Sequence, residues 1–169
     1  VQGREAGGIT QHIGASFLPV ETIQKICGPL YEKLSKVEHK IPGILVIDTP
    51  GHEIFTNLRS RGGSAADIAI LVVDANRGFQ PQTNESLKIL ESRKVPFVVA
   101  LNKTDMISGW KDVQTQFISQ IIEKQNPEVQ TFLDEKIYNV VTALSVLGYQ
   151  SEAFYRINDY KKEIAIVPV

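Results

Sequence analysis

Two short polar motifs, each placed directly after an apolar run, have residue types and spacing that suit chemistry. Asp48-Thr-Pro-Gly-His52 follows the apolar residues 44–47, and Asn102-Lys-Thr-Asp105 follows the apolar residues 97–101. Short apolar runs rich in β-branched residues are typical of buried strands. Ligands of open parallel sheets bind at the carboxyl ends of the strands, so both motifs are predicted to lie where a ligand binds.

The first motif has the right chemistry for a phosphate group and its magnesium ion. Asp48 can hold magnesium through water, because this ion keeps most of its hydration shell. Gly51 has no side chain, so its N–H can approach a γ-phosphate closely. His52 can orient the water that attacks the phosphate, since phosphoryl transfer depends mainly on positioning and charge stabilisation. Taken alone, the motif is equally compatible with a simple turn, in which Pro and Gly are common.

The second motif has the right chemistry for a guanine ring. The Asp105 carboxylate can accept two N–H groups from the guanine edge, which adenine does not supply. The Asn102 amide can bond the opposite edge of the base, and the stem of Lys103 can pack over the ring face. Polar groups arranged for one base are left unpaired by another, which produces discrimination. A polar loop that merely ends a strand is the alternative, but the two motifs together predict a GTPase.

A third candidate is Thr10, which lies in the glycine-framed segment 7–14. Its hydroxyl is a plausible magnesium ligand, and a loop tethered to the γ-phosphate is ordered with the triphosphate and released after hydrolysis. A Gly-rich loop with a threonine is by itself also compatible with a flexible connector.

The elements that must position these motifs follow from the apolar pattern. Nearly continuous apolar runs predict strands at residues 43–48, 68–74, 96–101 and 163–169, and residues 17–20 are predicted to form a short extended segment. Such runs suit a parallel sheet that is covered on both faces. A helical period predicts helices at 21–34, 82–93 and around 117–122 and 132–144, with breaks at Gly28-Pro29 and Asn126-Pro127. The alternation of strands and helices predicts an α/β fold with a doubly wound sheet.

Bulk properties narrow the class of protein. A length of 169 residues with 43% hydrophobic content and a net charge of -1 is typical of one soluble globular domain and argues against nucleic-acid binding through global charge. The single cysteine, Cys27, excludes an internal disulfide. No apolar run approaches the roughly 20 residues of a membrane span, so a cytoplasmic location without membrane contact is expected.

The motifs also carry a family resemblance. Together with Gly8-Ile-Thr10, they resemble those of translational GTPases. The stretches 4–15 and 79–83 are similar to the ribosomal subunit-joining initiation factor, known as bacterial initiation factor two and archaeal or eukaryotic factor five B. The segments 21–40 and 109–160 are similar to the archaeal and eukaryotic branch, and the simple organisation of 21–40 favours the archaeal type. The resemblance covers essentially the whole chain.

This resemblance implies a P-loop NTPase-like fold, a mostly parallel doubly wound sheet flanked by helices, that binds GTP or GDP with Mg²⁺ and hydrolyses GTP. Thr10 would belong to the first switch, and Asp48 and Gly51 to the second, with Thr10 and Asp48 serving the metal. His52 would be the catalytic histidine that orients water. The guanine-reading residues would be Asn102, Lys103 and Asp105. Thr104 stands where the family usually has Ile, and little effect is expected from that difference.

The resemblance also implies partners and boundaries. A factor of this type acts on the large-subunit GTPase-activating region of the ribosome and contacts initiator tRNA through other domains, as a monomer. The family's Gly-x-x-x-x-Gly-Lys-Thr phosphate loop and its Ser-Ala loop do not occur in residues 1–169. We therefore expect a single GTP-binding domain, truncated at both ends and inactive on its own.

Two alternatives to an initiation GTPase stay open at this point. One is a non-catalytic GTPase-like module that serves only as a docking surface. The other is a different translational GTPase, such as an elongation factor that carries aminoacyl-tRNA, although the long match at residues 4–15 weighs against it.

Overall fold

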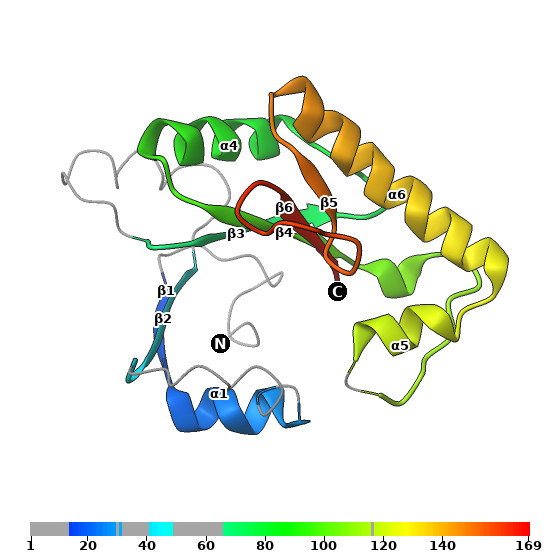
Figure 1. The fold of residues 1–169 in the computed structure, drawn as a ribbon, viewed down its shortest axis with the longest axis horizontal. Coiled ribbons are helices and arrows are strands. Elements are labelled where there is room, and N and C mark those ends of the chain that lie inside the picture. The colour runs from blue at the N-terminus through cyan, green and yellow to red at the C-terminus, as the bar shows by residue number, and fades with distance from the viewer. Residues whose placement is uncertain (1–13, 30, 32–40, 49–65, 116) are drawn as a thin grey trace, which may run out of the picture. The chain divides into compact units, whose positions relative to one another are not determined.

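All the strands that the apolar runs predict are present in the computed structural model, which describes residues 14–29, 31, 41–48, 66–115 and 117–169. The chain divides into two compact units, Val1–Gly62 and Gly63–Val169. Figure 1 labels their helices and strands. The predicted site residues Thr10, Gly51 and His52 lie outside the described residues.

The first unit contains two strands and a helix: β1 (Gly14–Pro19), α1 (Val20–Cys27) and β2 (Gly43–Asp48). Strands β1 and β2 are antiparallel, with a register that runs from the Gly14–Asp48 pair to the Pro19–Gly43 pair. Strand β2 has the predicted bounds. The expectation that it joins a parallel sheet is corrected, because β1 is the strand to which it is hydrogen-bonded.

The close approach of the two strands depends on Gly43. A Cβ atom at this position would lie 2.3 Å from the carbonyl oxygen of Leu18 and 2.7 Å from the Phe17 ring. Any side chain would therefore push the strands apart. An extended segment was expected only at residues 17–20, so the sequence pattern underestimated the length of β1 and with it the antiparallel pairing.

Helix α1 is shorter than the predicted helix at 21–34. It ends at Cys27, and the next residue, Gly28, has a φ of 49°, a backbone conformation that favours glycine. The predicted break at Gly28-Pro29 is therefore confirmed.

The second unit contains a four-stranded parallel sheet with the strand order β3-β4-β6-β5. Its strands are β3 (Ala69–Asp74), β4 (Phe97–Asn102), β5 (Ser151–Ala153) and β6 (Ile164–Pro168). The predicted strands at 68–74, 96–101 and 163–169 are confirmed to within one residue at each end. Strand β5 was not predicted, because three residues with one apolar side chain give no period.

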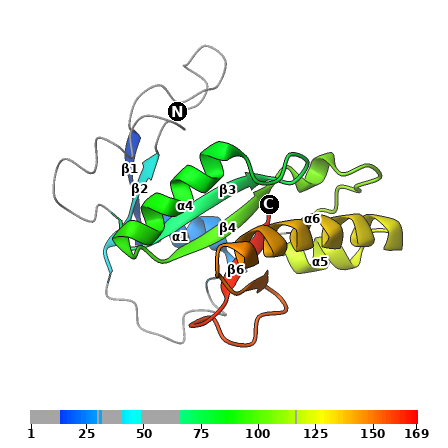
Figure 2. The same cartoon turned by 90° about the horizontal axis from the view of Figure 1, so that it is seen from above.

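The helices of this unit are α4 (Pro81–Arg93), α5 (Ile118–Glu123) and α6 (Pro127–Val146), with a short 3₁₀ turn, η2, at Thr104–Met106. Proline occupies the first position of both α4 and α6, where its missing N–H costs no intrahelical bond. Helices α4 and α6 lie over the same face of the sheet (Figures 1 and 2). None of the described helices combines the length and the apolarity needed to cross a membrane.

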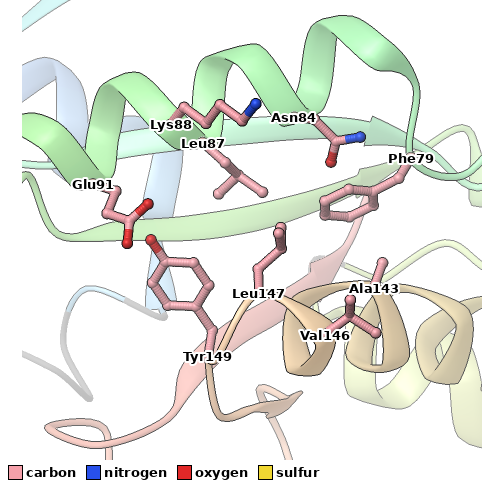
Figure 3. Close-up of a pocket in the computed structure, with 9 residues that line it drawn as sticks. All are labelled: Phe79, Asn84, Leu87, Lys88, Glu91, Ala143, Val146, Leu147 and Tyr149. Carbon is pink, nitrogen blue, oxygen red and sulfur yellow. The ribbon is translucent and has the colours of Figure 1, made fainter.

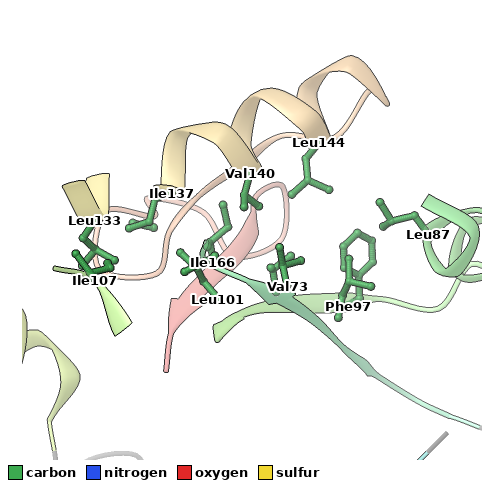
Figure 4. Packing of buried hydrophobic residues seen from close by; sticks show 14 of the residues in the cluster. Val73, Leu87, Phe97, Leu101, Ile107, Leu133, Ile137, Val140, Leu144 and Ile166 are labelled. Atoms are coloured by element: carbon green, nitrogen blue, oxygen red, sulfur yellow. The ribbon is translucent and has the colours of Figure 1, made fainter. Parts of the chain in front are cut away.

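The core of this unit fills the space between that face of the sheet and the two helices (Figure 4). Its fully buried members come from five different elements: Val73, Val99, Leu101, Leu133, Ile137, Val140, Leu144, Ala153 and Ile166. At β3 the opposite face is open, since Ile70 and Val72 are 68% and 58% exposed. The expected cover on both faces is therefore shown only for the face that packs against α4 and α6.

The packing predicts a large difference between two positions of α6. Changing Ile137, which is 0% exposed, to Ala should lower the free energy of unfolding by about 2–5 kcal/mol, because it removes core contacts and leaves a cavity. Changing Val146, which is 82% exposed, to Ala should alter it by less than about 0.5 kcal/mol. Urea denaturation followed by circular dichroism measures both, and equal losses would contradict the packing described here.

Candidate functional site

The parallel register of β3 and β4 brings two polar residues together at the carboxyl edge of the sheet. Asp74, the last residue of β3, pairs with Asn102, the last residue of β4. The N–H of Ala75 continues the ladder and donates to the Asn102 carbonyl at 2.9 Å. The motif Asn102–Asp105, which is predicted to read guanine, therefore begins at the edge where ligands of parallel sheets bind.

The motif turns sharply at Lys103. This residue has a φ of 65° and a ψ of 37°, the left-handed conformation, which is uncommon for a residue other than glycine. Its N–H donates to the side-chain oxygen of Asn102 at 2.8 Å. This conformation lets the chain pass from β4 into the η2 turn through a single residue, and such uncommon backbone conformations cluster at functional sites.

Asp105 lies in the η2 turn and is exposed. Among the residues that the structure describes, none makes a hydrogen bond or ion pair with its carboxylate. Its oxygens are therefore available to donors from outside the protein. An unengaged carboxylate at a ligand-binding edge is what a guanine-reading aspartate requires.

Thr104, between Lys103 and Asp105, anchors the motif. It is 2% exposed, and both its N–H and its hydroxyl donate to the Val169 carbonyl, at 3.3 and 3.0 Å. The N–H of Val169 in turn donates to the Leu101 carbonyl at 2.9 Å. Sequence reasoning gave Thr104 little weight, because its partner is 65 residues away and leaves no local pattern.

Thr104 therefore supports a prediction about stability. Thr104→Val keeps the shape but removes the hydroxyl donor, so the free energy of unfolding should fall by about 1–2 kcal/mol. Thr142→Val is the matched control, because the exposed hydroxyl of Thr142 bonds only its own helix, at the Tyr138 carbonyl; a change within about 0.5 kcal/mol is expected there. Chemical denaturation measures both. A Thr104→Val protein as stable as the control would show that the buried bond does not matter.

Asp74 is a first residue of the site that sequence reasoning missed. The Lys103 ammonium lies 2.8 Å from its Oδ2 atom, and Oδ1 accepts the N–H groups of Asn76 and Arg77 at 2.9 and 3.2 Å. The one available signal was its place at the end of an apolar strand, the same feature that singled out Asp48.

The pKa of Asp74 is lowered, chiefly by the hydrogen bond from Lys103 and further by the two backbone N–H groups, while desolvation opposes the shift. A lowered pKa means that the carboxylate stabilises the fold above the ordinary aspartate pKa. This contribution is lost as the pH falls through the lowered value. Asp74 is therefore ionised at neutral pH, as its ion pair with Lys103 requires.

A second residue that sequence reasoning missed, Gln125, holds the segment that follows the motif. Its Oε1 accepts the N–H of Lys111 at 2.8 Å, and its Nε2 donates to the carbonyls of Lys111 at 2.8 Å and Ile121 at 3.1 Å. The side chain is 5% exposed and its polar atoms are bonded, as a buried amide requires. Only its place beside the Asn126-Pro127 break marks it in the sequence.

The first motif is described only in part. Asp48 ends β2, as predicted, and pairs with Gly14 in the register of β1 and β2. The roles assigned to Thr10, Gly51 and His52 fall outside the described residues, so they stay predictions.

A groove also lies between α4 and the end of α6 (Figure 3). Its volume is about 450 Å³, and its lining is mostly apolar, with Phe79, Leu87, Leu147 and Tyr149 among the contributing side chains. None of the predicted site residues that the structure describes lines this groove. It is therefore separate from the candidate site at the end of β4.

With this geometry established, comparison with known proteins decides the family. Residues 2–163 match the family described as the elongation factor Tu GTP binding domain. The chain belongs to that family. The predicted resemblance is thereby confirmed, and the α/β fold with a parallel sheet flanked by helices is the one expected of this GTP-binding domain.

Individual relatives agree with this assignment. Proteins named "Probable translation initiation factor IF-2" are 54% identical over 168 residues in Methanopyrus kandleri and 55% identical over 166 residues in Sulfurisphaera tokodaii. These matches cover 99% and 98% of this chain, but only 28% and 27% of the relatives. The chain thus spans little more than a quarter of the length of these relatives. Their identity to this chain confirms the archaeal-type resemblance.

A solved structure gives the same result. The crystal structure of GDP-bound aIF5B from Aeropyrum pernix is similar to this GTP-binding domain, with a TM-score of 0.82 and 52% sequence identity. The match covers 98% of this chain and 28% of that protein.

Proposed function

We propose that this chain is the GTP-binding and GTP-hydrolysing core of a translation initiation factor that promotes the joining of ribosomal subunits. The observation that carries the proposal is the placement of Asn102, Lys103 and Asp105 at the carboxyl end of β4, in a chain of the elongation factor Tu GTP-binding domain family. The names of the relatives support the assignment to initiation.

Recognition of the base follows from the second motif. The exposed Asp105 carboxylate accepts the two N–H groups on one edge of guanine. Asn102 bonds the opposite edge, and the stem of Lys103 packs on the ring face. The Thr104 anchor fixes the η2 turn to the end of β6, so these groups are held in place before GTP or GDP arrives.

Hydrolysis is assigned to the first motif and to Thr10. The hydroxyl of Thr10 and, through water, the carboxylate of Asp48 are hard oxygen donors of the kind Mg²⁺ prefers, and these residues would hold the ion. When bound, the ion neutralises charge on the phosphates. Gly51 would donate its N–H to the γ-phosphate, and His52 would orient the attacking water as the catalytic residue.

The proposed partners are the large-subunit GTPase-activating region of the ribosome and, through other domains, initiator tRNA, with the cytoplasm as the compartment and a monomer as the state. The family match at residues 2–163 extends over most of both compact units, which supports their assignment to one GTP-binding domain. A non-catalytic module or an elongation factor that carries aminoacyl-tRNA is less well supported, since the relatives are named as initiation factors.

Base reading by Asp105 is tested with Asp105→Asn in the full-length protein. The amide oxygen still accepts, but its NH₂ group faces guanine N–H donors, so GDP affinity should fall by about 100-fold or more. Xanthosine diphosphate should bind better than GDP, because its extra carbonyl accepts from the amide. Calorimetric titration measures both affinities. Asp112→Asn, at an exposed aspartate outside the motif, should bind like the wild type. Unchanged preference in Asp105→Asn would refute the assignment.

The catalytic role of His52 is tested with His52→Ala in the same protein. Ribosome-stimulated GTP hydrolysis should fall by about 100-fold or more, because the water loses its orienting group, while GTP affinity stays within about twofold. Single-turnover phosphate release and equilibrium titration separate the two effects. His39→Ala, which removes an imidazole outside the motif, is the control. A parallel loss of affinity and rate would point to a structural role for His52.

A further inference from the structure

The two oxygens of the Asp74 carboxylate have different partners. Oδ1 accepts the N–H groups of Asn76 and Arg77 and shapes the turn after β3. Oδ2 accepts the ammonium of Lys103, which lies 29 residues further along the chain, at 2.8 Å. The carboxylate thus couples the turn after β3 to the base-reading motif after β4.

This contact fixes the far end of the Lys103 side chain. The near end is already set, because the backbone of Lys103 is in the left-handed conformation. The Lys103 side chain is 50% exposed, and an exposed lysine stem otherwise samples many rotamers, all but a few of which are lost when it packs on a ligand. The Asp74 side chain is only 22% exposed and is held by its backbone bonds, so it is the fixed partner of the pair.

We propose that Asp74 is a positioning residue of the base site, which holds the Lys103 ammonium so that the lysine stem is set in advance to pack on the face of guanine. The inference rests on the proposed function and adds a residue to that site. Ordering a side chain before the ligand arrives increases affinity, because the cost of ordering is no longer met on binding. Discrimination between bases stays with Asp105, since Asp74 is bonded to the lysine.

A purely structural role for Asp74 is the competing explanation, and one substitution separates the two. Asp74→Asn keeps an oxygen that can accept from Asn76 and Arg77, so the turn survives. It replaces Oδ2 with an NH₂ group, which cannot accept from the ammonium. Asp74→Ala removes both functions at once. If Asp74 is purely structural, only Asp74→Ala should weaken GDP binding. If Asp74 positions Lys103, both Asp74→Ala and Asp74→Asn should weaken it.

The experiment measures GDP and inosine diphosphate affinities of the full-length protein by calorimetry. Asp74→Asn should weaken GDP binding by about 3- to 10-fold, the range that an exposed ion pair and one ordered side chain can supply. The ratio of GDP to inosine diphosphate affinity should stay within about twofold, because that ratio reports on Asp105. In a Lys103→Met background, Asp74→Asn should have no further effect, because the ammonium is already absent.

The control is Asp134→Asn, the same chemical change at another aspartate of this unit, which pairs with Arg156 at 2.8 Å. It should leave GDP affinity unchanged. Wild-type affinity in Asp74→Asn, or a full additional loss in the Lys103→Met background, would overturn the positioning role. A wild-type protein that does not prefer GDP to ADP would refute the proposed function itself, so the two failures are distinguishable.

Discussion

The hydrogen-bonded register between β3 and β4 is the constraint on which the candidate site depends. Six consecutive pairs, from Ala69–Phe97 to Asp74–Asn102, fix where each strand ends relative to the other. A shift of one residue would move Asp74 away from Asn102 and would also exchange buried and exposed side chains along the strand. The apolar residues Val73, Val99 and Leu101 are at most 1% exposed, and their packing in the core stabilises this register. The same packing that forms the core therefore sets the position of the polar residues at its edge.

The polar contacts around the site form a short series of anchors from separate parts of the chain. Thr104 bonds the end of β6, Asp74 bonds Lys103, and Gln125 bonds the loop at Lys111. Each joins segments that are distant in sequence or separated by a loop. These hydrogen bonds hold residues 103–104, directly before Asp105, and the loop at Lys111, which follows it. The turn that carries the exposed Asp105 is therefore held in place on both of its sides.

Much of this arrangement could be predicted from sequence, because it depends on local patterns. Strand and helix positions follow from apolar runs and helical periods, and Gly28-Pro29 and Asn126-Pro127 mark breaks through backbone sterics alone. The motif after β4 was recognisable because the base-reading chemistry proposed for it restricts its residue types. In contrast, β5 is too short to show a periodic pattern of apolar residues. The antiparallel pairing of β2 depends on the position of its partner strand β1, which the residues of β2 do not indicate. Asp74, Thr104 and Gln125 act through partners that no local pattern identifies, so their roles emerged only from the folded chain.

The left-handed backbone of Lys103 has a consequence for the amino acids that this position can accept. A β-branched residue is disfavoured there by sterics, whatever its chemistry, whereas Gly and Asn adopt the conformation readily but have no long stem to lay over a base. A long unbranched side chain with a cationic end is compatible with this backbone, with the ion pair to Asp74 and with the proposed contact with the ring face of guanine. The backbone conformation of the turn thus restricts which residues can occupy position 103. Fewer residue types are permitted there than the requirements of ligand contact alone would allow.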